Sequence, residues 1–241
     1  MTGAATTAVK ICGLTRAADA AHARASGVNY LGVILASGPR LLDVSRARAV
    51  FGPHPHASDS ANEDGVRDSR ERDAQRVAVF GAQSAVEVVD IVQQLTLDVV
   101  QLHGDVTVHD IRHIAEATGR AVWPVLRVDG TELPSEAEAL AEAANWLVLD
   151  AKVRGQLGGT GVVLDWSGLA ESVTQLRRRV PGLQLVLAGG LRPTNVGEAI
   201  RLLAPDVVDV SSGVETAPGV KDPAAVEQFV TAVRTATGIR G

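Results

Sequence analysis

Residues 76–103 read RVAVFGAQSAVEVVDIVQQLTLDVVQLH, and this stretch predicts the repeating unit of the fold. It begins with the short apolar run RVAVF (76–80) and ends with a second one, DVVQLH (98–103). Between the two runs, Ser84 and Glu87 have the spacing of a capping box at a helix N-terminus. An apolar stripe at helical period follows, formed by Ala85, Val88, Val89, Val92 and Leu95. The stretch therefore predicts a strand, a helix and a second strand.

The same alternation continues from this unit to both ends of the chain. Eight runs are expected to form strands: VKIC (9–12), NYLGVIL (29–35), RVAVF (76–80), DVVQLH (98–103), AVWPVLRV (121–128), NWLVLD (145–150), LQLVLA (183–188) and DVVDVS (206–211). Such near-continuous apolar runs are typical of strands covered on both faces. Eight strand–helix units in 241 residues predict one (β/α)₈ TIM barrel domain over residues 1–241. The competing fold is a doubly wound open sheet, but no glycine-rich dinucleotide fingerprint follows the first strand.

Two further helices have recognisable N-termini. Ser135 and Glu138 repeat the capping-box spacing ahead of the sixth strand. Near the end of the chain, Asp222 is a good N-cap residue, and Pro223 stands at the first helical position. The apolar residues that follow it recur at helical period: Val226, Phe229, Val230 and Val233.

One stretch, residues 54–75, interrupts this pattern. Its sequence, HPHASDSANEDGVRDSRERDAQ, contains nine charged residues and almost nothing large and apolar. We interpret it as a mobile surface insertion that has no core to order it. A lid over an active site is the alternative. That alternative is less favoured because the connection leads into the N-terminal end of a strand, opposite the usual active-site face of a barrel.

Composition excludes several classes of protein. Hydrophobic residues make up 46% of the chain and charged residues 21%, which excludes a disordered protein. The net charge of −5 argues against nucleic-acid or anionic-membrane partners. No apolar run approaches the ~20 residues that span a bilayer, and no signal peptide is recognisable. The single cysteine, Cys12, cannot form an internal disulfide, so we expect a cytoplasmic protein.

Polar residues gather at the carboxyl ends of the expected strands, where barrel enzymes hold their reactive groups. In VKIC, strand alternation puts Lys10 and Cys12 on one face, and Val9 and Ile11 suit the helix layer on the other. The other strand ends add further polar groups to the same end of the barrel: Gln101, His103, Asp150, Asp209 and Ser211.

A lone cysteine such as Cys12 is most often a small buried hydrophobe. Lys10 on the same face favours a reactive thiolate instead, so we expect the pKa of the Cys12 thiol to lie below its ordinary value of about 8.5. Asp150 leaves two interpretations open. It is either an acid–base group or a structural residue that forms a salt bridge or caps the following loop.

Glycine-rich loops follow the last three strands: RGQLGGTG (154–161), AGG (188–190) and SSGVE (211–215). Glycines free backbone N–H groups to approach an anion, and barrels often bind phosphate after strands seven and eight. Three such loops in succession predict a phosphate site. His109 and His113 are four residues apart but lack a third ligand, so we predict no metal ion, and we also predict no cofactor.

Taken together, these motifs resemble the phosphoribosylanthranilate isomerase family. The matching stretches are VKICGLTR (9–16), ASGPR (36–40), VVQLHGD (99–105), LVLDAKVRGQLGGTGVVLDW (147–166), LVLAGGLRPTNV (185–196) and DVSSGVETAPGVKD (209–222). They occur in order at the expected strand ends and span nearly the whole chain. KICG near the start, combined with GGTG…DW and SSGVE…PGVKD, makes the resemblance specific.

The resemblance implies an Amadori rearrangement without a cofactor, in L-tryptophan biosynthesis. The phosphosugar N-(5′-phosphoribosyl)anthranilate would become 1-(2-carboxyphenylamino)-1-deoxyribulose 5-phosphate. Asp150 matches the family's general acid, which protonates the furanose ring oxygen, and Cys12 matches its general base, which removes the proton from C2′. Asp150 must therefore carry a proton near neutral pH. Arg40 matches the residue that contacts the anthranilate moiety.

The resemblance also assigns residues to binding. His103 and Asp209 match polar positions near the site, and with Lys10 and Arg40 we assign them to the substrate. Four residues lie in the matching phosphate-binding loops: Gly159, Gly190, Ser212 and Gly213.

Two other functions remain open at this stage. A related barrel enzyme also rearranges the histidine-pathway aminoimidazole analogue, but such enzymes have an aspartate where this chain has Cys12, together with half-barrel repeats that are not evident here. A phosphosugar-binding barrel without catalysis would keep the glycine-rich loops and would not need both Cys12 and Asp150. Both a monomer and a homodimer are compatible with a barrel of this size.

Overall fold

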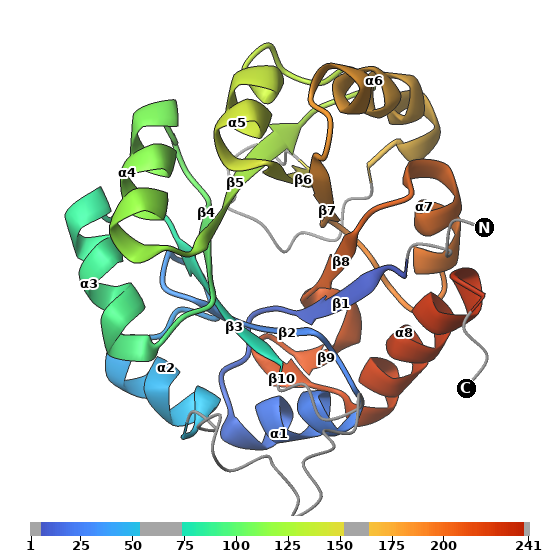
Figure 1. Cartoon of the computed structure of the whole chain (residues 1–241). Coiled ribbons are helices and arrows are strands. Elements are labelled where there is room, and N and C mark those ends of the chain that lie inside the picture. The colour runs from blue at the N-terminus through green and yellow to red at the C-terminus, as the bar shows by residue number, and fades with distance from the viewer. Residues whose placement is uncertain (1–5, 54–73, 152–163, 239–241) are drawn as a thin grey trace, which may run out of the picture.

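The computed structural model describes residues 6–53, 74–151 and 164–238 and consists of a closed barrel ringed by helices (Figure 1). Each strand pairs in parallel with the next in sequence, and β1 closes the barrel against β8. The barrel strands are β1 Ala8–Ile11, β2 Tyr30–Ile34, β3 Gln75–Phe80, β4 Val99–Leu102, β5 Ala121–Val128, β6 Trp146–Ala151, β7 Gln184–Leu187 and β8 Val207–Val210. The predicted (β/α)₈ TIM barrel is confirmed, and the predicted strand ends lie within one residue of the observed ones.

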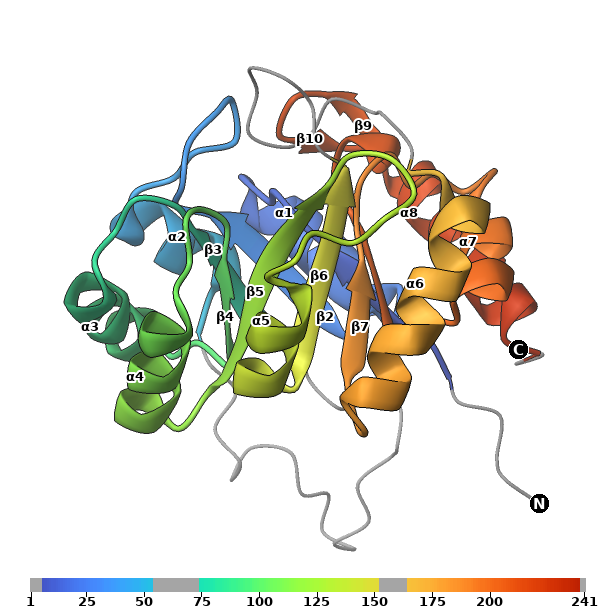
Figure 2. The ribbon, with the colours of Figure 1, turned by 90° about the horizontal axis from the view of Figure 1, so that it is seen from above.

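Helices connect successive strands on the outside of the barrel. They are α1 Ala17–Ala25, α2 Val44–Phe51, α3 Ala85–Leu95, α4 Val108–Thr118, α5 Ala137–Ala144, α6 Trp166–Arg179, α7 Val196–Leu203 and α8 Pro223–Ala236. In Figure 2 the strands run toward one end of the barrel, where a short hairpin of β9 (Glu215–Ala217) and β10 (Val220–Lys221) also lies. This hairpin was not predicted, and it follows β8 directly after a 3₁₀ turn at Ser212–Val214.

Two of the three predicted helix caps are present. Ser84 accepts from the Glu87 N–H while the Glu87 carboxylate accepts from the Ser84 N–H, which completes the capping box. The Asp222 carboxylate accepts from the first N–H groups of α8, and Pro223 begins that helix. The predicted box at Ser135 is wrong. The Ala137 N–H bonds the Pro134 carbonyl in a tight turn, so α5 begins two residues after Ser135, which therefore lies outside the cap position.

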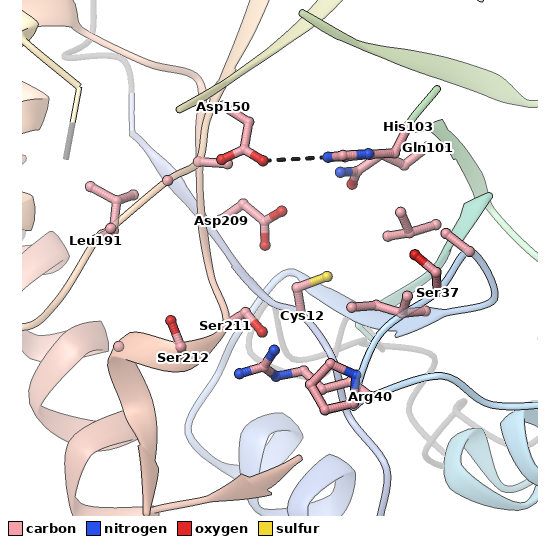
Figure 3. Close-up of a pocket in the computed structure, with 18 residues that line it drawn as sticks. Cys12, Ser37, Arg40, Gln101, His103, Asp150, Leu191, Asp209, Ser211 and Ser212 are labelled. Atoms are coloured by element: carbon pink, nitrogen blue, oxygen red, sulfur yellow. Dashed lines mark hydrogen bonds and ion pairs between the residues drawn. The ribbon is translucent and has the colours of Figure 1, made fainter. Parts of the chain in front are cut away.

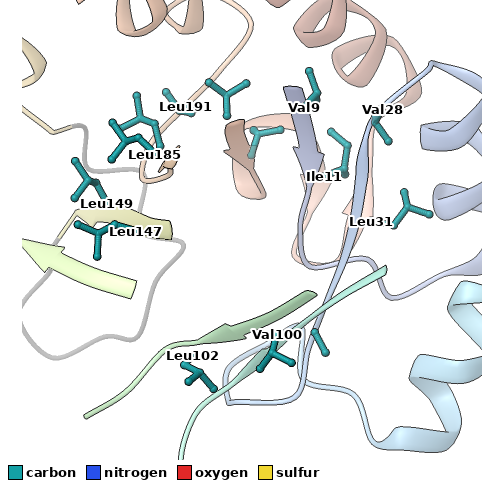
Figure 4. Packing of buried hydrophobic residues seen from close by; sticks show 14 of the residues in the cluster. Val9, Ile11, Val28, Leu31, Val100, Leu102, Leu147, Leu149, Leu185 and Leu191 are labelled. Atoms are coloured by element: carbon teal, nitrogen blue, oxygen red, sulfur yellow. The ribbon is translucent and has the colours of Figure 1, made fainter. Parts of the chain in front are cut away.

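Strand alternation sorts the buried residues into two apolar layers. Outward-facing strand residues such as Ile11, Leu31 and Leu149 pack beneath the helices (Figure 4). A second cluster fills the barrel interior around Trp123 and Val148. This arrangement confirms that Val9 and Ile11 face the helix layer, which leaves the side chain of Lys10 inside the barrel.

Most of the predicted insertion at 54–75, residues 54–73, lies outside the described residues. Its last two residues belong to the fold. Ala74 is buried, and β3 already begins at Gln75, whose N–H bonds the Asn29 carbonyl. The predicted insertion therefore extends two residues too far. None of the helices in the described ranges has the length and apolarity that a membrane crossing requires.

Candidate active site

A pocket opens at the carboxyl end of the barrel, and it gathers most of the predicted site residues (Figure 3). The predicted residues that line it are Cys12, Arg40, His103, Asp150, Gly190, Asp209, Ser212 and Gly213. Lys10 lies beside it, bonded to Asp209. Gly159 lies outside the described residues. Side chains from β1, β4, β6 and β8 thus converge on one cavity.

Lys10 and Asp209 form a buried ion pair on neighbouring strands. The Lys10 ammonium donates to Oδ2 of Asp209 at 2.7 Å, and the side chain of Lys10 is fully buried. Burial lowers the pKa of Lys10, but the adjacent Asp209 carboxylate and Cys12 more than offset this, so the pKa lies above its ordinary value. The other oxygen of Asp209, Oδ1, is buried without a hydrogen-bond partner among the described residues. It is therefore available to accept from a ligand.

Cys12 lies at the end of β1 and is 5% exposed. Burial raises the pKa of its thiol above the ordinary value, and the Lys10 ammonium lowers it by less. The predicted decrease is therefore wrong, because the effect of burial outweighs that of the Lys10 ammonium, and the Asp209 carboxylate raises the pKa as well. Gly32 on β2 leaves room for the side chains of Cys12 and Lys10, because an added Cβ there would lie 3.1 Å from both the Cys12 Sγ and the Lys10 Cε.

Asp150 ends β6 with its carboxyl group in the pocket and faces His103, which follows β4 (Figure 3). Nε2 of His103 lies 3.4 Å from Oδ2 of Asp150, which is longer than a typical N–H···O hydrogen bond. Both side chains are about nine-tenths buried. Gly189 allows the close packing on the other side, because an added Cβ there would lie 2.9 Å from Oδ1 of Asp150.

Arg40 is held at the edge of the pocket by two residues that sequence reasoning missed. Its guanidinium donates to both carboxylate oxygens of Glu215, with the shortest contact at 2.6 Å. Glu215 also accepts from the Lys221 ammonium at 2.7 Å. Burial raises the pKa of Glu215, but these two cations together lower it by more, so this pKa lies below the ordinary value. Both residues occur in the quoted stretch 209–222, where Pro218 and Gly219 are a turn signal for the hairpin, but no local pattern shows that this hairpin brings Glu215 to Arg40.

The loops after β7 and β8 present backbone donors to the pocket. Gly189 and Gly190 have φ angles of 83° and 66°, in the left-handed region that favours glycine. Gly190, Ser212 and Gly213 line the pocket, and their N–H groups donate no hydrogen bond to any other residue of the described ranges. Such N–H groups suit an anion. Within the same ranges, no three His, Cys, Asp or Glu residues are placed to hold a metal ion.

Comparison with known proteins agrees with this geometry. The sequence profile described as N-(5'phosphoribosyl)anthranilate (PRA) isomerase matches residues 9–232. The chain belongs to the N-(5′-phosphoribosyl)anthranilate isomerase family. It is 37% identical over 229 residues to the isomerase of this name from Pseudomonas aeruginosa (strain LESB58), covering 94% of this chain and 95% of the relative. It is 36% identical to the Acidithiobacillus ferrooxidans isomerase, and the match covers 94% of this chain and 97% of that relative.

Solved phosphoribosylanthranilate isomerases share the barrel. The Thermotoga maritima enzyme superposes with a TM-score of 0.72 at 29% identity, covering 95% of this chain and all of that one. The Thermus thermophilus enzyme gives a TM-score of 0.71 at 28% identity, covering 95% and 99%. A further isomerase of this name was solved with reduced 1-(o-carboxyphenylamino)-1-deoxyribulose 5-phosphate, with a TM-score of 0.70 at 28% identity, covering 95% and 100%.

Proposed function

We propose that this chain converts N-(5′-phosphoribosyl)anthranilate to 1-(2-carboxyphenylamino)-1-deoxyribulose 5-phosphate, with Asp150 as general acid and Cys12 as general base. Family membership makes it an isomerase of L-tryptophan biosynthesis. The assignment of roles rests on one observation. Asp150 on β6 and Cys12, which follows β1, line the same pocket as Arg40 and as residues of the last two loops whose N–H groups donate no hydrogen bond within the described ranges.

The first step opens the sugar ring. Asp150 gives its proton to the furanose ring oxygen as the bond from that oxygen to C1′ breaks. The nitrogen lone pair then forms the C1′=N bond of a cationic Schiff base. His103 lies 3.4 Å from the Asp150 carboxyl group and holds its orientation. A positioned acid of this kind contributes about 10²–10⁴-fold to the rate.

The second step removes the proton from C2′. The Cys12 thiolate takes this proton, and the electrons of the C–H bond form a C1′=C2′ double bond while the nitrogen regains its lone pair. The resulting enolamine becomes the ketone when C1′ gains a proton and the C2′ hydroxyl loses one. Burial raises the pKa of Cys12, so before this step the thiol must give its proton to a solvent water in the pocket. The positive charge of the Schiff base favours that loss.

Substrate binding uses groups at the two edges of the pocket. Arg40 carries the positive charge that suits the anthranilate carboxylate. The N–H groups of Gly190, Ser212 and Gly213 suit the phosphate, which also fits the acidic net charge because backbone donors do the binding. Gly159 is proposed for the same role from its motif. Asp209, whose Oδ1 lacks a partner in the described residues, is proposed to accept from a sugar hydroxyl, and Lys10 keeps it in place.

The test is the decay of anthranilate-type fluorescence when purified protein meets freshly generated phosphoribosylanthranilate. Rapid decay with the unaltered chain and a decay at least about 10²-fold slower with Cys12→Ala would support both the reaction and the base. No decay with either protein would favour a barrel that binds phosphosugars without catalysis. Turnover of the histidine-pathway analogue would instead favour the broader isomerase.

The oligomeric state is proposed as monomer or homodimer. A solved relative from Thermotoga maritima is described as a dimer that was converted to monomers. Light scattering on the purified protein decides between the two states. A small phosphosugar as the only substrate partner, no nucleic-acid partner, no cofactor and a cytoplasmic location all remain predictions.

A further inference from the structure

Three charged side chains form a buried cluster beside the pocket. Arg40, Glu215 and Lys221 have side chains that are 10, 4 and 2% exposed. Glu215 lies at the centre, because its carboxylate accepts from Arg40 on one side and from Lys221 on the other. Burying charges costs about as much free energy as their pairing returns, so a buried ion pair is weak evidence for a stabilising role. The cluster therefore calls for a functional explanation.

The geometry of Arg40 suggests what that function is. A guanidinium group has two edges that can each grip a carboxylate, one formed by Nε with Nη2 and one formed by the two Nη atoms. Glu215 occupies the first edge, at 2.8 Å from Nε and 2.6 Å from Nη2. Within the described ranges, Nη1 donates no hydrogen bond. Arg40 itself lines the pocket, which leaves the second edge as the one that a carboxylate inside it would contact.

Lys221 sets the charge of the cluster. Arg40 and Glu215 alone would be neutral and would attract an anion only weakly. Lys221 pairs with Glu215 at 2.7 Å and brings the net charge of the three groups to +1. Its ammonium also donates to the Ser211 carbonyl at 3.1 Å, directly after β8. The cluster thus keeps one net positive charge at the edge of the pocket.

The chain fixes both members of the Arg40–Glu215 pair. The stem of Arg40 packs on Gly13, where an added Cβ would lie 2.5 Å from its Cδ. The hairpin that carries Glu215 is tied to α1, because the Lys221 N–H donates to Asp19 at 3.0 Å. The Asp19 carboxylate in turn accepts two hydrogen bonds from the Arg16 guanidinium. The guanidinium is therefore held from two directions by rigid parts of the barrel.

We propose that Glu215 is a positioning residue that gives the pocket its preference for a substrate with an aryl carboxylate. It holds Arg40 so that the second guanidinium edge faces that carboxylate, while Lys221 keeps the cluster cationic. This inference rests on the proposed function, in which Arg40 contacts the anthranilate moiety. It adds two residues that do not themselves contact the substrate.

The test compares two ligands by calorimetry. One is reduced 1-(o-carboxyphenylamino)-1-deoxyribulose 5-phosphate, and the other is the same compound with a plain phenylamino group. The ratio of their Kd values measures the preference for the carboxylate. Glu215→Gln should reduce this preference about tenfold, roughly the worth of one hydrogen bond to a charged group. KM should rise in parallel and kcat should change less than about threefold, as expected when binding that is common to the ground state and the transition state is lost.

Glu215→Gln keeps the shape of the side chain and removes its charge. Burial lowers the pKa of Lys221 and the Glu215 carboxylate raises it, so this substitution lowers that pKa further. Because the substitution removes a negative charge, the cluster stays cationic, and a lost preference for the carboxylate reports the orientation of Arg40. Glu227→Gln is the matched control, because the same substitution falls on a side chain that is 65% exposed, and it should leave the preference unchanged.

The remaining outcomes separate this inference from the proposed function. Arg40→Ala should abolish the preference, and adding Glu215→Gln to it should change nothing more. If Arg40→Ala keeps the preference, both the Arg40 assignment and this inference are overturned. If Arg40→Ala loses it but Glu215→Gln keeps it, or if both ligands weaken equally in Glu215→Gln, only this inference is overturned. Ligand binding decides the matter even if the chain shows no turnover.

A second variant keeps the inference testable if Glu215→Gln does not fold. Arg40→Lys preserves the positive charge, but a lysine ammonium held by Glu215 has no second planar edge. It should lose the preference as fully as Arg40→Ala does. A preference within about twofold of the unaltered protein, a difference of only about 0.4 kcal/mol, would show that charge alone suffices and would overturn the positioning role.

Discussion

The two ends of the barrel interior differ in chemistry although the same strands build both. At the N-terminal end, Trp123 is fully buried, stacks on Trp146 with ring centroids 4.8 Å apart and meets the edge of Tyr30 at 5.0 Å. At the carboxyl end, the interior is lined by charged and polar groups, including Asp150 and Asp209. One end is a packed aromatic and aliphatic core, and the other is a cavity in which charged and polar groups lie beside apolar residues such as Ile34 and Val79.

Two of the strands change character within a single step of two residues. On β6, Val148 belongs to the interior core and Asp150 to the pocket. On β8 the same change occurs between Val207 and Asp209. On both strands the inward-facing period is kept, so the same face supplies a core residue first and a pocket residue two positions later. We call the packed N-terminal end of the barrel interior the lower layer and the carboxyl end with the pocket the upper layer. Stability should depend on the lower layer and chemistry on the upper layer, as is usual for this fold.

The strongest test of this division is Trp123→Ala. Removing a fully buried indole leaves a cavity in the lower layer, so the free energy of unfolding should fall by about 3–5 kcal/mol. Urea titration followed by circular dichroism measures the change. The molecules that remain folded should keep their KM. A loss below about 1 kcal/mol would mean that the lower layer is not the stabilising core.

The converse test is Asp150→Asn in the upper layer. The amide cannot give a proton to the ring oxygen, so kcat should fall by about 10²-fold or more. The free energy of unfolding should change by less than about 1 kcal/mol, because within the described ranges the carboxyl group makes a single long polar contact, with His103. The exposed Asp129→Asn is the matched control and should keep full activity. Near-normal turnover in Asp150→Asn would show that Asp150 is not the general acid.

A subtler test concerns charge in the upper layer. Lys10 lowers the pKa of Cys12, so Lys10→Met should raise this pKa further. The substitution also raises the pKa of Asp209, and a protonated Asp209 would no longer raise the pKa of Cys12, so the net rise is smaller than the loss of Lys10 alone would give. The pH dependence of alkylation by iodoacetamide measures the shift cleanly because the chain has one cysteine. Arg46→Met is the control at an exposed position and should not move the midpoint pH of alkylation. A lower midpoint in Lys10→Met would contradict the conclusion that Lys10 lowers the pKa of Cys12.

The sequence was sufficient for the barrel because its signals are local. Apolar runs and caps such as Ser84 and Asp222 depend on neighbours within four residues. Alternation then placed Lys10, Cys12 and Asp209 on the inner face correctly. The prediction of a cap at Ser135 was wrong because the Ala137 N–H bonds the Pro134 carbonyl in a turn at the start of the helix. Spacing alone does not reveal such competition.

What could not be predicted depends on contacts between distant parts of the chain. Glu215 reaches Arg40 across 175 positions, through a hairpin whose turn at Pro218 and Gly219 has a local signal but whose contact with Arg40 has none. The direction of the pKa shift of Cys12 depends on the balance between burial and two opposing charges, one of them on Asp209, about 200 residues away. The role of Gly32 likewise becomes visible only when β2 lies against β1.

The smallest expected effect tests whether the division holds for residues at the carboxyl end that do not line the pocket. Ser84 follows β3 at that end and caps α3, yet it lies outside the pocket lining. Ser84→Ala removes the hydroxyl that accepts from the Glu87 N–H, so the free energy of unfolding should fall by about 1 kcal/mol. Neither kcat nor KM should change.

This outcome would refine the comparison between the two ends. If Ser84→Ala costs stability alone, only residues that line the pocket carry chemistry, and the surrounding helix caps are part of the scaffold. Thermal unfolding and the fluorescence assay, run on the same preparations, measure both quantities. A drop in kcat of more than about threefold, or roughly 0.7 kcal/mol in the barrier, would mean that the start of α3 is coupled to the pocket. The boundary between scaffold and site would then lie farther from the pocket than the lining residues indicate.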